Sequence, residues 1–201
     1  MTKQGITKYI KIADKTVFIN GKSDFIGNDE QFGPFAKSVY RNYDIKYSKY
    51  FKMDNLCKLG FLASEILLKD IDLSNYKPEE VALILANSSS SLSNDNKYQN
   101  TISNQASPAV FVYTLANIVI GEICIRNNFK GESTFFIQKE FDTDFMVNYV
   151  NTILQTTKAK VCILGWVEVD IENNYEAFLC LIDRDNDSLL LTTGNLNKIL
   201  V

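Results

Sequence analysis

The feature that most constrains the fold is a run of six consecutive apolar residues, Val81 to Ala86. A run of this length without polar alternation is typical of a strand buried on both faces. Ahead of it, apolar residues recur at helical spacing from Leu56 to Leu67. Asp54 is placed to cap that helix, which we expect to end near Asp70. A buried strand that follows an apolar helix indicates an α/β layered fold.

Helical and strand patterns continue to alternate along the chain. Ser107 and Pro108 are an N-cap and a first-turn residue, and the helix that they begin is expected to run to Asn127 as a buried element. Gly121 within it indicates a close backbone contact, and Asp142 or a neighbour is expected to begin another helix. Strands are predicted at 9–13, 16–19, 81–86, 134–137, 160–169 and 177–182, and loops at 32–51 and 87–104. This alternation predicts an α/β protein with a mostly parallel central sheet flanked by helices.

The composition is that of one globular domain, residues 1–201. Hydrophobic residues make up 46% and charged residues 22% of the chain. The net charge is −3 and no Lys/Arg cluster exceeds two residues, so we expect no nucleic-acid partner. The first fifteen residues carry no continuous apolar segment and no run of about 18 apolar residues occurs elsewhere. We therefore expect a cytoplasmic protein without a membrane span.

Histidine is absent from the chain, which excludes Ser-His and Cys-His catalytic pairs. The cysteines are widely spaced and form no C-x-x-C pair, so we expect four buried free thiols in a reducing compartment. A zinc site would need four well-placed ligands, and we expect neither a metal nor another cofactor. The cysteines are Cys57, Cys124, Cys162 and Cys180.

Carboxylates concentrate in one short segment, Glu140 to Asp144, between a predicted strand and a predicted helix. Acidic residues there complement the helix dipole, and Asp142 is a candidate cap. A metal-binding or acid/base role would need partners from elsewhere in the chain. Glu168, Asp170 and Glu172 alternate at a strand end, where we expect a solvated edge.

Three blocks of sequence carry a resemblance to a known family. The first is Phe51–Asp54, with the helix to Leu68 and the apolar strand after it. The second is Ser107–Arg126, and the third is Phe129–Ser133. The blocks resemble the N-terminal half of the β-ketoacyl-[acyl-carrier-protein] synthases, which have the thiolase-like fold. That family shows a similar R-x-M-D before an Ala/Leu-rich helix, then S-P, P-N-x-x-x-G-x-x-x-I-R and G-P-S/N. The second and third blocks agree with it in register without a gap, and the likeness spans about residues 8 to 183.

The resemblance implies where a nucleophile would lie, and the chain departs from the family there. In these synthases a strand after the G-P motif leads to a cysteine at the N-terminus of a buried helix. Counting from Gly131 places Glu140 at that position, so no acyl-thioester forms there. Ala116 and Glu132 stand where the family has prolines. The two catalytic histidines, which belong to the second half of the fold, have no counterpart in this chain.

These departures indicate a non-catalytic ketosynthase-like subunit, similar to a chain-length factor, in fatty-acid, polyketide or polyene synthesis. The resemblance implies pairing with an active ketosynthase subunit or with a second copy, and contact with acyl carrier protein. In the family, the strand before the nucleophile pairs across the dimer interface. Its counterpart here is Thr134, Phe135, Phe136 and Ile137, which would leave an apolar edge for a partner.

Two other functions stay open at this point. Glu140 would assist malonyl decarboxylation or acyl transfer if a partner completed its site, in which case the chain is part of an enzyme. The chain would otherwise be a free-standing module that binds an acyl ligand, with the Ser88–Ser91 segment near the mouth of its pocket.

Overall fold

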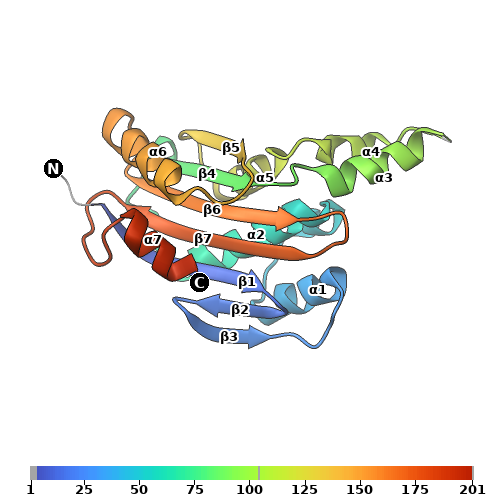
Figure 1. Ribbon diagram of the computed structural model, residues 1–201, viewed down its shortest axis with the longest axis horizontal. Helices are drawn as coiled ribbons and strands as arrows, with labels where there is room; N and C mark the ends of the chain where they lie inside the picture. The colour runs from blue at the N-terminus through green and yellow to red at the C-terminus, as the bar shows by residue number, and fades with distance from the viewer. Residues whose placement is uncertain (1–3, 104, 201) are drawn as a thin grey trace.

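The computed structural model describes residues 4–103 and 105–200, which form one seven-stranded sheet with helices on both faces (Figure 1). The strands are β1 (Gly5–Ala13), β2 (Thr16–Ile19), β3 (Lys22–Ile26), β4 (Val81–Asn87), β5 (Ser133–Ile137), β6 (Val161–Val169) and β7 (Tyr175–Asp183). Their order across the sheet is β3-β2-β1-β7-β6-β4-β5. The α/β prediction is confirmed.

The prediction of a mostly parallel sheet is wrong. β4 pairs parallel with β5 and with β6, whereas β1 with β2, β2 with β3, β1 with β7 and β6 with β7 are antiparallel. For the pairs of consecutive strands, β1–β2, β2–β3 and β6–β7, the cause is the short connection, because a parallel pair needs a crossover of a dozen or more residues. β7 also pairs antiparallel with β1, which lies far from it in the sequence. β1 and β2 are joined by Asp14 and Lys15 alone, both with positive φ.

Helices cover both faces of the sheet. They are α1 (Phe32–Asn42), α2 (Asn55–Leu68), α3 (Leu92–Ile102), α4 (Pro108–Phe111), α5 (Ile118–Asn127), α6 (Thr143–Thr156) and α7 (Thr193–Leu200). α1, α2 and α5 pack on one face and α6 and α7 on the other. Within β4, Leu83 and Leu85 face the first layer, whereas Ala82 and Ile84 face the second. The predicted burial of this strand on both faces is confirmed.

The predicted helix starts have the expected caps. Asp54 Oδ1 accepts a hydrogen bond of 2.9 Å from the Cys57 amide, and Asp142 Oδ1 accepts one of 2.9 Å from the Phe145 amide. The Ser107 hydroxyl oxygen accepts from the Val110 amide at 3.4 Å. Local capping chemistry therefore sets where these three helices begin.

Two predicted loops contain helices. The 32–51 segment forms α1 and a short 3-10 helix, η1 (Ser48–Lys52), and the 87–104 segment forms α3. In α1, Phe32, Phe35 and Val39 are buried at helical spacing, a pattern that the aromatic and charged composition obscured. α3 has no such pattern, since its one buried residue is Asn94. In Figure 1, α3 and α4 extend together beyond the end of the sheet.

The predicted single helix from 109 to 127 is broken. α4 is followed by a 3-10 turn, η3 (Val112–Thr114), and the chain bends by 98° before α5. The bend lets the Tyr113 hydroxyl reach Glu122 Oε1 at 3.2 Å, whereas nine residues of straight helix span roughly 13 Å. The expected burial holds only for α5, because Phe111 and Leu115 are exposed.

In the described ranges, no single helix is long and apolar enough to cross a bilayer. The bent pair Pro108–Thr114 and Ile118–Asn127 has that length and composition only when its two parts are counted together.

Candidate functional site

The carboxyl ends of β4, β5 and β6 point the same way, because the three strands are parallel to one another. Glu140 lies at this end of the sheet, in the connection between β5 and α6, and its side chain is exposed. α6 begins at Thr143, with Asp142 as its cap. Glu140 therefore lies two residues ahead of the helix cap, and the carboxylate at the helix N-terminus is that of Asp142.

The other acidic residue of this segment also has a structural role. The Thr193 hydroxyl donates to Asp144 Oδ1 at 2.6 Å, which ties the start of α7 to the start of α6. The interpretation of the acidic segment as helix-capping is confirmed for Asp142, and Asp144 lies in the first turn of α6, where a carboxylate complements the helix dipole. Within the described ranges, no group of three or more Asp, Glu or Cys side chains is placed to hold a metal ion.

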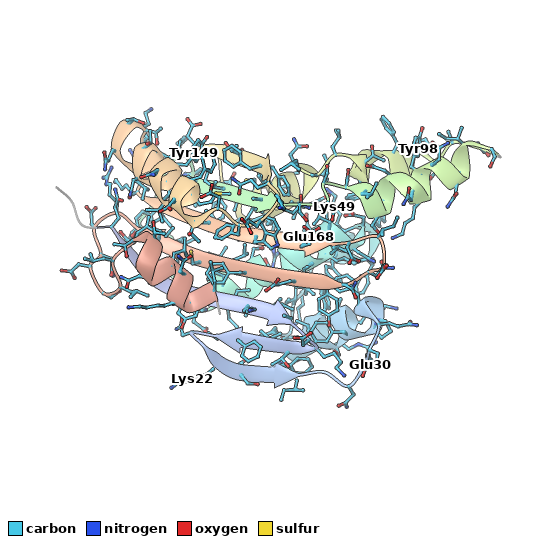
Figure 2. The ribbon with its side chains drawn as sticks, viewed as in Figure 1. Lys22, Glu30, Lys49, Tyr98, Tyr149 and Glu168 are labelled. Atoms are coloured by element: carbon cyan, nitrogen blue, oxygen red, sulfur yellow. The ribbon has the colours of Figure 1, made fainter. Side chains whose placement is uncertain are left out.

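Glu168 does not form a solvated edge as predicted. Its Oε2 accepts hydrogen bonds from the Ser88 amide (2.7 Å), the Ser88 hydroxyl (2.6 Å) and the Ser89 amide (3.3 Å). Figure 2 labels Glu168 near the end of β6. One carboxylate thus fixes the turn that follows β4. Its Oε1 atom is buried and, like Gln138 Oε1, has no hydrogen-bond partner among the described residues.

The Ser88–Ser91 segment is a tight turn rather than an open loop. Asn87 is buried, donates to the Ser90 carbonyl at 2.8 Å and accepts from the Ser90 amide at 3.0 Å. The enclosed cavity between this turn and the start of α2 holds about 10 Å³. That volume suits about one water molecule, so an acyl group does not fit there.

A buried polar cluster on the face of the sheet that α2 and α5 cover was not predicted. Glu122 of α5 is 4% exposed, and its Oε2 lies 2.8 Å from Lys49 Nζ on η1. The hydrogen bond to Glu122 raises the pKa of Lys49, and burial raises the pKa of Tyr113. Lys49 is labelled in Figure 2. A glutamate within the otherwise apolar stretch Ile118–Ile125 was the sequence signal for this cluster. The ion pair anchors α5 to η1.

None of the four thiols has the lowered pKa of a catalytic nucleophile. Burial raises the pKa of Cys57 and Cys162, and it raises that of Cys124 to about 11. Burial also raises the pKa of Cys180. All four are free, as predicted; Cys124 is only partly buried, contrary to the prediction of four buried thiols. A reactive cysteine needs a depressed pKa, so the environments of these thiols favour structural roles.

β5 is the last strand of the sheet, so one of its sides has no neighbouring strand. The Leu83 amide donates to the Glu132 carbonyl, and the Gln138 amide donates to the Asn87 carbonyl, both at 2.9 Å. Alternation along the strand then directs the backbone N–H and C=O groups of Ser133, Phe135 and Ile137 outward. This edge offers a regular row of hydrogen-bonding groups.

A groove of about 650 Å³ runs beside this edge, between β5 and α5. Ile118, Ile120 and Ile137 supply apolar walls, and Ile137 is 55% exposed. Gly121 also lines the groove, and a Cβ built on it would meet nothing within 4 Å. The close contact predicted at Gly121 is therefore not made within the described chain.

Neither a protein-family model nor a curated protein matches the chain. Solved structures do match. A chain of the ketosynthase complex with its chain length factor from Xenorhabdus doucetiae has a TM-score of 0.60 at 11% identity, over 92% of this chain and 80% of that one. A β-ketoacyl synthase from Burkholderia phymatum gives 0.60 at 10%, over 92% and 59%. A chain of a type II polyketide synthase acyl-carrier protein in complex with its ketosynthase gives 0.63 at 15%, over 92% and 63%.

The chain has the thiolase-like fold of the β-ketoacyl synthases. Identities of 10–15% establish the fold and not a residue-level role. The chain spans 80% of the length of the first of these structures and 63% and 59% of the length of the other two.

Proposed function

We propose that the chain is a non-catalytic ketosynthase-like subunit, similar to a chain-length factor, that pairs through β5 with an active β-ketoacyl synthase in fatty-acid, polyketide or polyene synthesis. The unpaired apolar edge of β5, with its groove, is the observation that carries the proposal. Among the proteins of similar fold are a ketosynthase in complex with its chain length factor and a ketosynthase in complex with an acyl-carrier protein.

The absence of catalysis by this chain alone is supported by the chemistry at the end of β5. Glu140 occupies the position that the family resemblance gives to the nucleophile, and its carboxylate is exposed. An exposed carboxylate is a poor nucleophile toward a thioester. The four thiol pKa values are all raised, and the sequence has no histidine to act as a base.

Pairing through β5 is supported by the geometry of its edge. A partner strand laid antiparallel against it would exchange hydrogen bonds with Ser133, Phe135 and Ile137. The side chains of Phe135 and Ile137 lie on the α5 side of the sheet, along the groove. Strand addition would therefore combine backbone hydrogen bonds with burial of apolar surface.

Gly121 gives independent support. Glycine inside a helix costs roughly 1 kcal/mol relative to alanine, and nothing in the described chain approaches this one closely. A groove-lining glycine lets the backbone of another element come near the helix. We infer that the element belongs to the partner.

The test is co-purification with a ketosynthase encoded beside this chain, followed by calorimetric titration. Ile137→Lys places a charge in the middle of the proposed interface and should weaken binding about 30-fold or more. Ile26→Lys is the matched control, because Ile26 is 67% exposed on the opposite edge of the sheet. Equal binding by both variants, or no binding by the natural chain, would rule out the proposed pairing.

A basic surface supports contact with acyl carrier protein in the assembled complex. The segment 37–58 carries six Lys/Arg and two Asp, whereas the whole chain has a net charge of −3. Burial lowers the pKa of Lys58, the nearby Asp54 carboxylate opposes that shift, and the charges of Lys97 and Lys37 add to it, so these two cations lie near Lys58. A carrier protein presents its acyl group on an anionic phosphopantetheine arm, which a basic surface would attract.

Charge reversal tests this contact separately from subunit pairing. Lys58→Glu should slow association of the carrier protein with the complex and reduce its salt dependence, while leaving the ketosynthase–subunit affinity unchanged. Lys22→Glu on β3 is the control. If Lys58→Glu leaves the association rate of the carrier protein unchanged, the docking surface lies elsewhere.

A further inference from the structure

Two partly buried lysines, Lys8 and Lys58, differ in what their amines contact. Lys8 Nζ donates to the Ile66 carbonyl at 3.0 Å and to the Lys69 carbonyl at 2.8 Å, at the end of α2. Lys58 lies in the first turn of α2, and its Nζ forms no hydrogen bond or ion pair with the residues that the structure describes. Burial is the largest cause of a lowered pKa in both lysines. Of these two amines, only that of Lys58 is free to react.

The charged groups that face Lys58 come from three elements. Asp54 and Cys57 belong to the start of α2, Lys97 lies on α3 and Lys37 lies on α1. Burial lowers the pKa of Lys58, Asp54 and Cys57 oppose that shift, and Lys97 and Lys37 add to it. The positive end of the α2 dipole acts in the same direction as the two lysines. The amine of Lys58 is therefore neutral more often than that of an exposed lysine.

A neutral amine beside exposed cations suits an electrophile that carries negative charge. Lys37 and Lys97 are exposed and can attract phosphate groups, whereas the uncharged amine of Lys58 is a nucleophile for a carbonyl carbon. Asp54 does not neutralise this cluster as an ion-pair partner, because its Oδ1 accepts from the Cys57 amide at 2.9 Å. An acyl thioester on phosphopantetheine has both required parts, a reactive carbonyl and an anionic phosphate.

We infer that Lys58 is an acyl-acceptor site that takes the acyl group of a phosphopantetheine thioester. The Nζ lone pair attacks the thioester carbonyl carbon, so that a C–N bond forms and the C–S bond breaks. The proton that the amine loses goes to the leaving thiolate, and no further reactant is consumed. The inference rests on the proposed function for its substrate class.

Acylation would also regulate the basic surface. The product is a neutral amide, so each reaction removes one positive charge from the cluster of Lys37, Lys58 and Lys97. The attraction of this surface for the anionic arm of a carrier protein would fall accordingly. An excess of acyl thioester would thereby slow the docking of its own carrier.

Acetylation of the isolated chain tests the site. The chain is incubated at pH 8 with acetyl-CoA or with S-acetyl-N-acetylcysteamine, which has no phosphate, and peptide mass spectrometry follows each lysine. With both thioesters, Lys58 should react at least about three times as fast as Lys22, an exposed lysine of β3. Lys8 should react more slowly than Lys22, because two carbonyls hold its amine.

Two outcomes of this experiment would overturn the inference. Equal rates at Lys58 and Lys22 would show that the amine of Lys58 is not unusually reactive. Preference for Lys58 with acetyl-CoA alone would show that the cations only attract phosphate, and that the amine itself is ordinary.

Removal of the neighbouring cations distinguishes a tuned amine from one that is merely accessible. Lys37→Met combined with Lys97→Met should raise the pKa of Lys58 and slow its acetylation about two- to fivefold at pH 8. The difference should shrink as the pH rises and the amine becomes neutral in both chains. Lys130→Met combined with Lys139→Met removes the same charge from another surface and is the matched control. An unchanged pH profile in the first variant, with its fold kept by circular dichroism, would contradict the inference.

Carrier-protein association separates this inference from the proposed function. Selective acetylation of Lys58 without carrier association overturns the proposed carrier contact and leaves the acceptor site standing. Carrier association without selective acetylation overturns only the acceptor site. Where both occur, limited acetylation confined to Lys58 should slow carrier association about twofold or more. An unchanged association rate would overturn the regulatory role.

Discussion

The two edge strands of the sheet, β3 and β5, have opposite character. β3 carries Lys22 and Asp24, and its pairing with β2 shifts register at a bulge. β5 has no charged residue between Ser133 and Ile137 and pairs with β4 in continuous register. Charges and bulges are the usual means by which an edge avoids pairing with another chain.

This difference indicates that the lack of protection is a property of the β5 edge and not of the sheet as a whole. Both strands belong to the same sheet, so the composition of the chain as a whole does not explain why only one edge is protected. β3 is also tied to the helix beside it, because the Tyr43 hydroxyl donates to Asp24 Oδ2 at 2.5 Å. β5 instead borders a groove. The contrast supports β5 as the edge that is covered in an assembly.

The largest expected effect concerns the buried ion pair between Lys49 and Glu122, which anchors α5, one wall of the groove, to η1. Lys49→Met would leave the buried Glu122 carboxylate without its counter-charge and should destabilise the fold by about 3 kcal/mol. We expect the lower end of the usual range because Lys49 is partly in water. Urea unfolding followed by circular dichroism measures this change.

The matching change at the other edge is Tyr43→Phe, which removes the hydrogen bond to Asp24 and should cost about 1–2 kcal/mol. A larger loss for Tyr43→Phe than for Lys49→Met would contradict the view that the buried ion pair is the stronger support. Glu122→Gln combined with Lys49→Met should recover part of the lost stability, since no buried charge then remains.

The reactivity of a thiol in the groove beside β5 should show whether a partner covers that groove. Cys124 lines the groove, and burial raises its pKa to about 11. Alkylation by iodoacetamide should therefore be slow at pH 8 and rise about tenfold per pH unit toward pH 10, since only the thiolate reacts. Peptide mass spectrometry should find Cys124 labelled before the three buried cysteines. Bound ketosynthase should protect it; unchanged labelling in the complex would argue against burial of the groove.

The connection that follows β5 should depend on Asp142 and not on Glu140. Asp142→Ala removes the cap of α6 and should cost about 1 kcal/mol in thermal or urea unfolding. Glu140→Ala should change stability by less than about 0.5 kcal/mol, because its side chain is exposed. A marked loss of ketosynthase binding or of complex activity in Glu140→Ala, with stability kept, would instead assign that carboxylate a chemical role.

The smallest expected effect has opposite signs for the isolated chain and the complex. Gly121→Ala should stabilise the free chain by about 0.5–1 kcal/mol, because the added Cβ meets nothing within 4 Å and helix propensity improves. The same methyl group should weaken ketosynthase binding. Unfolding and titration of one variant measure both. Unchanged binding would show that no partner backbone approaches α5 there.

Local chemistry determined a large part of this structure from the sequence alone. Three helices begin at the caps that the sequence predicts, Asp54, Ser107 and Asp142. The apolar run of β4 likewise predicts its burial. Each of these features depends on residues that are adjacent in the chain. The lack of histidine likewise limits the chemistry by composition alone.

Tertiary structure decided what depends on residues distant in sequence. The buried Glu122 of α5 is paired with Lys49 of η1, and the turn after β4 is held by Glu168 from 80 residues away. The sheet became mixed because β7 returned between β6 and β1. The sequence named Thr134–Ile137 as a candidate edge, but only the fold gave β5 an open side, with a groove along α5 and a second, charged cavity near its amino end. Those surfaces arise from segments that meet only after folding, so no local pattern could specify them.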